Sequence, residues 1–561
     1  MVKNKRIRNI ISLLLVFIMG FSTLSMTGCM LFEDQYEEIE EEVNNGTPST
    51  DDNTTEEPEE VVPMVDPISD DYRVFYHIFV GSFSDSNNDT IGDLRGIINR
   101  MDYLNDGDIN SGNDLGVQGI WLSPIFSSPS YHKYDASDYY KIDWRFGNED
   151  TLKELIELAH SRNVKVIIDL AINHTSNQHP WFKEFKQARI DGDTSNKYYN
   201  YYSCATENTR ENGKTYQKIA GVDCYYECNF TGDMPELNYD NPEVKAEMLA
   251  VAKYYLDLGI DGFRYDAVKY IYFNDTNRSV AFWNWYNAEL RAYKPDIYLV
   301  GECWSGDNEV IKYYGSMNCF NFSTAGAEGK IAVAAKGSGF TTYLNYIESY
   351  QDSIKNANKN AMMCAFLSNH DMDRIAGTFI NSANMKMAAN LYLLAHGSPF
   401  IYYGEELGMR GSRASEATDA NRRLAMLWGD SDRVKNPTGY TYPSDKQITT
   451  TVASQLEDPN SLLNHYAKVI AVRNKYEAIA RGDYNAVTSS NSKFGGFYVT
   501  YKGEVLGIFH NVSTSSITID INKCSGLDGN RFTELLEVLG SSAKLEGNML
   551  TIAANTSVIL K

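Results

Sequence analysis

The chain has 561 residues, of which 43% are hydrophobic and 22% are charged. These values are typical of globular proteins and exclude a largely disordered chain, and the length predicts more than one domain. The formal net charge is −23. A chain this acidic lacks the basic surface that phosphate groups require, so we expect no nucleic-acid partner.

Residues 1–28 have the order of an export signal: basic residues, then an apolar run, then small residues. The apolar run, Ile10 to Phe21, is shorter than the roughly 20 residues that span a membrane. The end of the segment resembles a bacterial lipoprotein signal. This implies a lipid on Cys29 and a place on the extracellular face of the cell membrane, held there only by that lipid. A cleaved secretory signal and an uncleaved anchor are the alternatives.

Residues 29–70 are predicted to form a disordered acidic tether. From Glu33 to Asp71 the sequence has 16 acidic residues and neither Lys nor Arg. Such a segment cannot bury enough apolar surface to offset the loss of chain entropy, and its like charges repel each other. We therefore expect the folded part to begin near residue 71.

Seven cysteines remain after Cys29, so at least one is free if disulfides form. Cys224 and Cys228 lack a second pair at zinc-site spacing, so these residues predict no metal site. A disulfide from Cys204 to one of these two stays open, because exported proteins often contain such bonds.

Apolar segments alternate with amphipathic ones in residues 71–480. Helical patterns include Thr151–Ser161, with capping-box spacing from Thr151 to Glu154, and Pro242–Leu258. Eight short segments have the composition of buried strands: Val74–Val80, Gly119–Ser123, Val164–Leu170, Gly262–Asp266, Tyr298–Glu302, Cys319–Ser323, Met363–Leu367 and Phe400–Tyr403. Eight strand–helix units predict an α/β fold, a (β/α)₈ TIM barrel with a parallel sheet.

Two regions depart from this alternation. Residues 174–238 show no strand–helix unit and are predicted to be a lobe inserted after the third strand. Residues 481–561 alternate apolar and polar positions with a period of two. They are predicted to form a C-terminal antiparallel β-sandwich domain, with strands at Gly496–Tyr501, Val505–His510, Ser516–Ile521 and Ser557–Leu560.

Acidic and histidine side chains stand at the ends of four of the predicted barrel strands. They are Asp169 and His174 at the end of the third strand, Asp266 at the end of the fourth, Glu302 at the end of the fifth, and His370 and Asp371 at the end of the seventh. Barrels of this type carry their chemistry where the strands end. Because converging carboxylates repel each other, a group of this kind usually marks a site.

These segments resemble the shared motifs of the α-amylase family of glycoside hydrolases, which here read DLAINH, GFRYDAVKY, GECW and SNHD in family order. The resemblance covers about residues 71–561. It implies a retaining reaction in which Asp266 is the nucleophile and Glu302 the general acid/base, about 5–5.5 Å apart. Arg264 would keep Asp266 ionised, and nearby carboxylates would raise the pKa of Glu302. Asp371 would stabilise the oxocarbenium-like transition state.

The resemblance also implies a set of substrate-binding residues: His132, Tyr134, His174, Arg264, Lys269 and His370. Tyr134 would stack on the sugar, and the two histidines of the motifs would hydrogen-bond it. Ala267 and Lys269 resemble members that cleave α-1,4 bonds, and His132 resembles members with an open cleft. We therefore expect an endo-acting α-amylase that degrades starch and maltooligosaccharides at the cell surface.

Several alternatives stay open. The segment from Met234 to Asn238 resembles the branch of oligo-1,6-glucosidases and neopullulanases, so an α-1,6-acting enzyme or a glucanotransferase is one alternative. A starch-binding surface lipoprotein without catalysis is another, from a different class. The intact catalytic trio favours an enzyme.

The segment after the first strand has oxygen ligands at alternate positions: Asp85, Asn87, Asp89 and Asp93, with the carbonyl of Ile91 between them. This spacing is that of the start of an EF-hand-like loop, although Gly96 stands where its last glutamate is expected. The same loop occurs in the branch named above. All the donors are hard oxygens, so we expect structural Ca²⁺ there, with Mg²⁺ as the less favoured ion.

Overall fold

The computed structural model describes residues 71–561, apart from 109–110, 380 and 414–415. The predicted signal (1–28), the lipid site at Cys29 and the predicted tether (29–70) lie outside the described residues. Within the described part, every helix is too short or too polar to cross a membrane.

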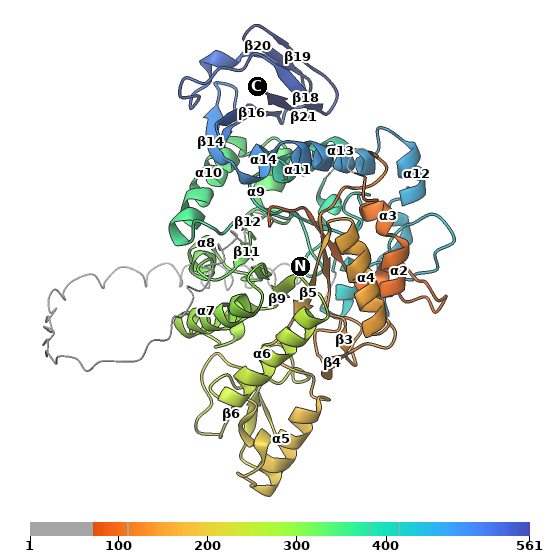
Figure 1. Cartoon of the computed structure of the whole chain (residues 1–561), viewed down its shortest axis with the longest axis vertical. Coiled ribbons are helices and arrows are strands. Elements are labelled where there is room, and N and C mark those ends of the chain that lie inside the picture. Colours follow the sequence, from red (N-terminus) through yellow and green to blue (C-terminus); the bar gives the residue numbers. More distant parts are fainter. Residues whose placement is uncertain (1–70, 109–110, 380, 414–415) are drawn as a thin grey trace, which may run out of the picture. The chain divides into compact units, whose positions relative to one another are not determined.

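Eight parallel strands form one sheet in which neighbours along the chain are neighbours in space. The strands are β1 (Phe75–Ile78), β2 (Gly119–Leu122), β5 (Lys165–Leu170), β9 (Gly262–Tyr265), β10 (Tyr298–Gly301), β11 (Asn318–Phe320), β12 (Met363–Cys364) and β13 (Phe400–Tyr402). β1 also pairs with β13, and a parallel bridge from Phe366 to Phe400 closes the ring. Each strand overlaps its predicted segment, so the predicted TIM barrel is confirmed (Figure 1).

Side chains that alternate along the strands fill the barrel. Phe75, Trp121 and Phe400 belong to an interior cluster, and the rings of Phe75 and Phe400 stack with centroids 4.8 Å apart. Gly119 lies directly opposite Phe75, where a Cβ atom would be 2.4 Å from the ring. A glycine at this position therefore makes room for the interior packing.

Helices cover the outside of the barrel (Figure 1). They are α2 (Leu94–Asn99), α3 (Met101–Leu104), α4 (Glu149–Ser161), α6 (Pro242–Asp257), α7 (Thr276–Tyr293), α8 (Asp307–Val310), α9 (Lys330–Ala335), α10 (Phe340–Ala357), α11 (Ser382–Leu393), α12 (Val452–Glu457), α13 (Leu462–Lys475) and α14 (Glu477–Arg481). The predicted capping box at Thr151 was wrong. The cap of α4 is Asn148, whose side chain accepts the Thr151 N–H, so the helix begins earlier.

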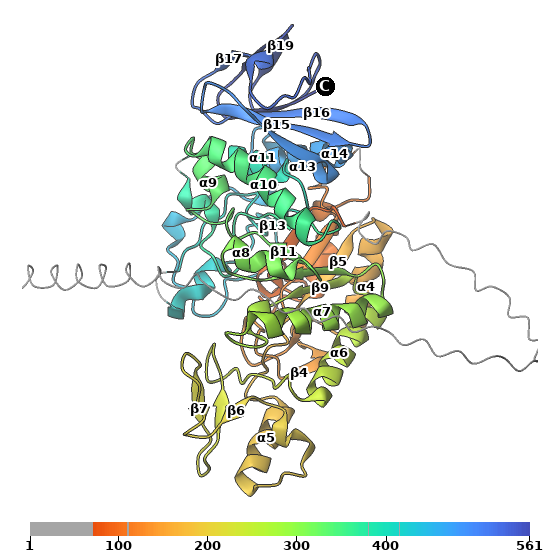
Figure 2. The ribbon, with the colours of Figure 1, turned by 90° about the vertical axis from the view of Figure 1, so that its left-hand side faces the viewer.

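A lobe interrupts the barrel after β5. It contains helix α5 (Pro180–Asp191) and a small antiparallel sheet in the order β6-β8-β7, from Cys204–Ala205, Tyr225–Glu227 and Tyr216–Lys218 (Figure 2). The sequence analysis did not predict α5. Its start is set by His179, which caps the Trp181 N–H, and by Pro180 at the first helical position. The hairpin of β3 (Phe126–Ser127) and β4 (Asp138–Ile142) was also not predicted.

The C-terminal part forms two antiparallel sheets, which confirms the predicted antiparallel domain. One has the order β14-β15-β16-β21-β18, and the other has the order β17-β20-β19. Their bounds are Asp483–Thr488, Phe494–Tyr501, Glu504–Asn511, Ile517–Asp520, Leu535–Leu539, Ala543–Glu546, Met549–Ile552 and Thr556–Leu560 for β14 to β21. Phe494, Phe509 and Leu550 belong to a core cluster built only from this domain.

Candidate active site

A cavity of about 710 Å³ lies where the barrel strands end. Asp266 directly follows β9, Glu302 directly follows β10, and Asp371 lies in the segment after β12. All three line the cavity, together with His132, Tyr134, His174, Phe230, Thr231, Met234, Ala267, Lys269, Tyr270, Trp304, Arg413, Asp419, Arg422 and Arg423. The three acids that are distant in sequence therefore share one cavity.

The guanidinium of Arg264 joins the acids from below. It is fully buried, and its Nη1 donates to Asp266 Oδ1 at 2.7 Å and to Asp169 Oδ1 at 2.8 Å. Its Nη2 lies 3.2 Å from Glu302 Oε2. Arg264 and Asp266 are two residues apart on an extended strand, so both side chains point the same way. One buried cation thus contacts all three carboxyl groups and holds them close together.

Glu302 has the electrostatic setting of a proton donor. Burial, together with the charges of Asp266 and Asp371, raises the pKa of Glu302 to about 8, against the opposing effect of Arg264. Its Oε2 accepts the backbone N–H of Ala267 at 3.1 Å. Ala267 has a left-handed backbone (φ +49°), which turns the chain after β9. At neutral pH this carboxyl group holds a proton that it can donate.

Asp371 has the opposite setting. Burial alone would raise its pKa, but His370, Arg423 and Arg264 together hold the pKa of Asp371 well below its usual range. Asp371 Oδ1 accepts from Arg423 Nη2 at 2.9 Å, and Oδ2 lies 2.8 Å from His370 Nε2. Asp371 therefore presents a negative charge to the cavity, which suits the stabilisation of positive charge on a sugar ring.

The predicted substrate-binding residues fall into two layers. His132, Tyr134, His174 and Lys269 line the cavity, whereas Arg264 and His370 are fully buried beneath it. The rings of Tyr134 and His370 stack at 5.1 Å, and the Tyr134 hydroxyl donates to Asp169 Oδ2 at 2.7 Å. Burial lowers the pKa of His132, to about 4, and that of His174, so both imidazoles are neutral at pH 7.

The sequence analysis missed the wall formed by the segment after β13. Arg423 Nη1 donates to the hydroxyl of Tyr131 at 2.8 Å and lies 3.0 Å from Asp419 Oδ2. The Arg422 Nη1 donates to the carbonyl of Asp371 at 2.6 Å. The only sequence signal was a pair of arginines in a polar segment without strand or helix periodicity, which gave no reason to place them near β12.

Aromatic rings on the other wall were also missed. Trp304 is 48% exposed and stacks on Phe322 with centroids 4.9 Å apart. The rings of Phe230 and Tyr270 meet at 4.8 Å. Trp304 stands inside the GECW motif, so its place beside Glu302 could have been inferred. Phe230 comes from the inserted lobe, for which the sequence predicted no strands or helices.

The five predicted metal ligands lie in one curved loop. Asp85 Oδ1 accepts the Asn88 N–H, and Asn87 Oδ1 and Asp89 Oδ1 accept the N–H groups of Asp89 and Ile91, each at 2.8 Å. Asp93 also caps α2 by accepting the Gly96 N–H. Hard oxygen donors at successive turns fit a cation such as Ca²⁺. Among the described residues, however, no three His, Cys, Asp or Glu side chains cluster as a metal site.

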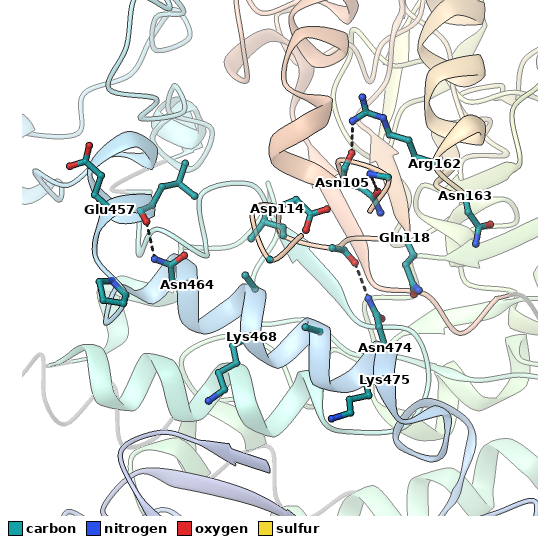
Figure 3. A pocket seen from close by; sticks show the side chains of 18 residues that line it. Asn105, Asp114, Gln118, Arg162, Asn163, Glu457, Asn464, Lys468, Asn474 and Lys475 are labelled. Carbon is teal, nitrogen blue, oxygen red and sulfur yellow. Dashed lines mark hydrogen bonds between the residues drawn. The ribbon is translucent and has the colours of Figure 1, made fainter. Parts of the chain in front are cut away.

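A larger cavity, of about 870 Å³, lies at the opposite end of the barrel strands, beside Asn105, Gln118 and Asn163 (Figure 3). Several of its polar side chains are bonded within the protein: Asn474 Nδ2 donates to the Gly116 carbonyl at 3.0 Å, for example. The described residues that line it include neither an aromatic ring nor a predicted catalytic residue. We therefore assign the active site to the cavity of about 710 Å³ that Asp266, Glu302 and Asp371 line.

The chain matches the family described as alpha amylase, catalytic domain, over residues 77–482. Alpha-amylase 3 of Dictyoglomus thermophilum is 33% identical over 476 residues, which cover 84% of this chain and 89% of that protein. A 4-alpha-glucanotransferase of Thermotoga maritima is 32% identical over 445 residues, covering 77% and 93%. The solved structure of Eubacterium rectale Amy13B has a TM-score of 0.80 at 33% identity and covers 89% of this chain and 98% of that one. The chain therefore belongs to the α-amylase family of glycoside hydrolases, whose members are retaining enzymes.

Proposed function

We propose that this enzyme is an endo-acting α-1,4-glucan hydrolase that degrades starch and maltooligosaccharides. The observation that carries the proposal is the convergence of Asp266, Glu302 and Asp371 on one cavity, with Glu302 protonated and Asp371 ionised at neutral pH. A cavity of about 710 Å³ has room for more than one sugar unit.

The reaction then takes two displacements. Asp266 attacks the anomeric carbon while Glu302 gives its proton to the departing glycosidic oxygen, which leaves a sugar bound covalently to Asp266. Glu302 next removes a proton from water, the hydroxide oxygen attacks the same carbon, and the bond to Asp266 breaks. The configuration is inverted twice and is thereby retained. Arg264 holds both acids in place throughout.

Replacing the nucleophile separates binding from catalysis. Asp266→Asn keeps the size of the side chain but removes the attacking charge, so we expect kcat on amylose to fall by about 10⁴-fold or more. The variant should still fold and bind maltooligosaccharides, as measured by calorimetry. Asp240→Asn, which alters an exposed carboxylate paired with Arg278, is the matched control and should keep full activity. Substantial turnover by Asp266→Asn would disprove the assigned role.

Transfer to a second sugar is the competing activity. It is favoured by the exposed ring of Trp304, which offers an acceptor sugar an apolar face, and by the similarity to a 4-alpha-glucanotransferase. Water and an acceptor sugar compete for the same covalent intermediate. The product pattern therefore decides between the two activities.

Time-resolved product analysis on amylose, pullulan and isomaltose tests the choice. An endo-acting hydrolase should shorten amylose through mixed oligosaccharides, with one new reducing end for each bond cleaved. Products longer than the substrate, without new reducing ends, would show a transferase. Glucose from isomaltose with no action on amylose would show an α-1,6 enzyme, and no reaction at all would leave a starch-binding protein.

We also propose that the enzyme is held at the extracellular face of the cell membrane by a lipid on Cys29. The support is the sequence of residues 1–29 alone. Cell fractionation after labelling with a radioactive fatty acid tests it. The wild-type chain should carry label in the membrane fraction, and Cys29→Ser should carry none. An unlabelled chain in the medium would favour the secreted alternative.

The loop from Asp85 to Asp93 is proposed to bind structural Ca²⁺, because its donors are hard oxygens on successive turns. A bound ion adds stability in proportion to the logarithm of its concentration above Kd. We expect a chelator to lower the midpoint of thermal unfolding by several degrees and added Ca²⁺ to restore it. The double variant Asp85→Asn with Asp89→Asn should not respond to either treatment. An unchanged midpoint in the wild type would argue against the ion.

A further inference from the structure

The inserted lobe holds three cysteines on one face of its small sheet: Cys204, Cys224 and Cys228. Cys204 lies on the edge strand β6, directly opposite Tyr226 of β8. Cys224 precedes Tyr226 by two residues, and its carbonyl extends the ladder to β7 by accepting the Ile219 N–H. Side chains two residues apart on an extended strand point the same way, so Cys204 and Cys224 share a face. Their thiols lie within hydrogen-bonding reach of each other.

Cys228 follows Tyr226 by two residues and is the other cysteine in the neighbourhood. Its surroundings differ, because the carboxyl groups of Glu236 and Glu227 lie beside it. Burial, and then these two carboxyl groups, raise the pKa of the Cys228 thiol to about 11. Cys224 instead has the Cys204 thiol as its hydrogen-bond partner. This contact between the two thiols favours Cys224 over Cys228, the two partners that the sequence left open for Cys204.

The pair also has a defined order of reactivity. The pKa of Cys204 is lowered to about 7, chiefly because the thiol of Cys224 donates a hydrogen bond to its sulfur. Cys204 is only half-buried, whereas Cys224 is buried. The same hydrogen bond, and then burial, raise the pKa of Cys224. An accessible thiolate beside a protonated neighbour is the arrangement that starts thiol–disulfide exchange.

We propose that Cys204 and Cys224 form a disulfide by exchange with a small-molecule disulfide such as oxidised glutathione. The thiolate of Cys204 attacks one sulfur of the reagent, and one glutathione thiolate leaves. Cys224 then loses its proton, attacks the Cys204 sulfur and displaces the second glutathione. Two protein thiols are oxidised to one disulfide, the reagent disulfide is reduced to two thiols, and the two protons of the protein thiols end on the two glutathione sulfurs.

The bond closes a ring that contains β7 and the exposed segment before it. Cross-linking two residues about 20 apart restricts the unfolded chain and so stabilises the lobe. Phe230, Thr231 and Met234, a few residues after Cys224, line the active-site cavity. The disulfide therefore restrains the sheet from which the chain runs on, through β8, to these lining residues.

Peptide mapping tests the proposal directly. After treatment of the whole chain with oxidised glutathione and digestion without reductant, mass spectrometry should find one peptide pair joined through Cys204 and Cys224. Cys228 should still react with an alkylating reagent. We expect reductant to lower the midpoint of thermal unfolding of the oxidised protein by about 2–5 °C.

Three single variants complete the experiment. Cys204→Ser and Cys224→Ser should lose both the cross-link and the response to reductant, whereas the matched control Cys228→Ser should keep both. A cross-link to Cys228 would overturn the choice of partner. Alkylation of both Cys204 and Cys224 in the oxidant-treated wild-type chain would overturn the disulfide itself.

Discussion

The positive charge of Arg264 reduces the repulsion among three carboxyl groups that lie close together in a buried site. It contacts Asp169, Asp266 and Glu302, and it is itself fully buried. Burial and the neighbouring charge of Asp266 still raise the pKa of Asp169 to about 7. Replacing Arg264 by a neutral residue would leave the negative charge of the buried acids uncompensated. We therefore expect such a replacement to disrupt the site.

The pH dependence of the reaction should report Glu302. The general acid must carry a proton in the first displacement, so the active fraction falls as the pH rises through the pKa of Glu302, about 8. We expect kcat/KM on maltooligosaccharides to decline above about pH 8, roughly tenfold per pH unit. Initial rates from pH 5 to pH 10 measure this limb.

Glu302→Gln provides the control for that assignment. In an aryl maltoside with an acidic phenol, the phenolate can leave without receiving a proton. The variant should therefore still form the covalent intermediate from this substrate and release the phenol in a burst. Its rate should show no decline near pH 8. If the same alkaline decline persisted in the variant, another group would be responsible for it.

At the residue scale, the sequence predicted the catalytic acids and Arg264, which contacts Asp266, but it missed Arg423, which contacts Asp371. Asp266, Glu302 and Asp371 stand at strand ends, where the barrel pattern alone indicates a common edge. Arg423 reaches Asp371 from a segment without regular structure, and no periodicity fixes the path of such a segment. Its position depends on contacts between distant parts of the chain, which a single sequence does not contain.

At the scale of single elements, the turn after β13 carries two adjacent buried acids, Glu405 and Glu406. Glu405 Oε1 accepts from the hydroxyls of Tyr392 and Tyr466 at 2.8 and 3.1 Å, and Glu406 Oε1 accepts from Tyr76 at 2.8 Å. Burial, with a smaller contribution from Glu406, raises the pKa of Glu405 to about 8. Tyrosine hydroxyls thus solvate a carboxyl group that stays protonated in the fold.

The raised pKa of Glu405 makes the free energy of unfolding depend on pH. Glu405 keeps its proton in the folded state up to about pH 8 but loses it near pH 4.5 in the unfolded chain. The folded state then binds the extra proton, so the free energy of unfolding falls as the pH rises from about 5 to 8, by up to about 1 kcal/mol per unit. Glu405→Gln should flatten this slope and unfold at higher urea concentration at pH 8. Glu457→Gln, at an exposed position, should behave like the wild type.

Strands and helices were predictable to different degrees. Barrel strands are continuous apolar runs and were found, although β12 is shorter than predicted because its chain turns toward Asp371 after a single bridge at Phe366. The start of α4 was misplaced because Asn148 and Thr151 are both good caps and only the path of the preceding turn selects one. Strands β18 to β20 escaped prediction because their faces are only partly buried.

At the scale of the whole folded part, the barrel and the C-terminal sheets share one core. Phe497, Val499 and Ile508 of the five-stranded sheet belong to the same apolar cluster as the barrel helices. Asn390 of α11 is fully buried and donates to the Leu539 carbonyl of β18 at 3.0 Å and to Ser557 Oγ of β21 at 2.9 Å. The pattern of apolar residues predicted the barrel and the C-terminal sheets but not the contact between them. Both faces of β15 and β16 are buried and apolar, so the sequence does not indicate which face packs against the barrel.

A shared core implies that barrel and sheets unfold together. Asn390→Ala removes two hydrogen bonds across the contact and leaves His465, 2.8 Å from Asn390 Oδ1, without that acceptor. Buried polar groups left unpaired cost about 1–3 kcal/mol. We expect scanning calorimetry to show one transition for the wild type and one transition at a lower temperature for the variant, by roughly 2–4 °C. Asn522→Ala, at an exposed position, is the control and should leave the midpoint unchanged. Two separate transitions, with only one of them shifted by Asn390→Ala, would show that the sheets fold independently of the barrel.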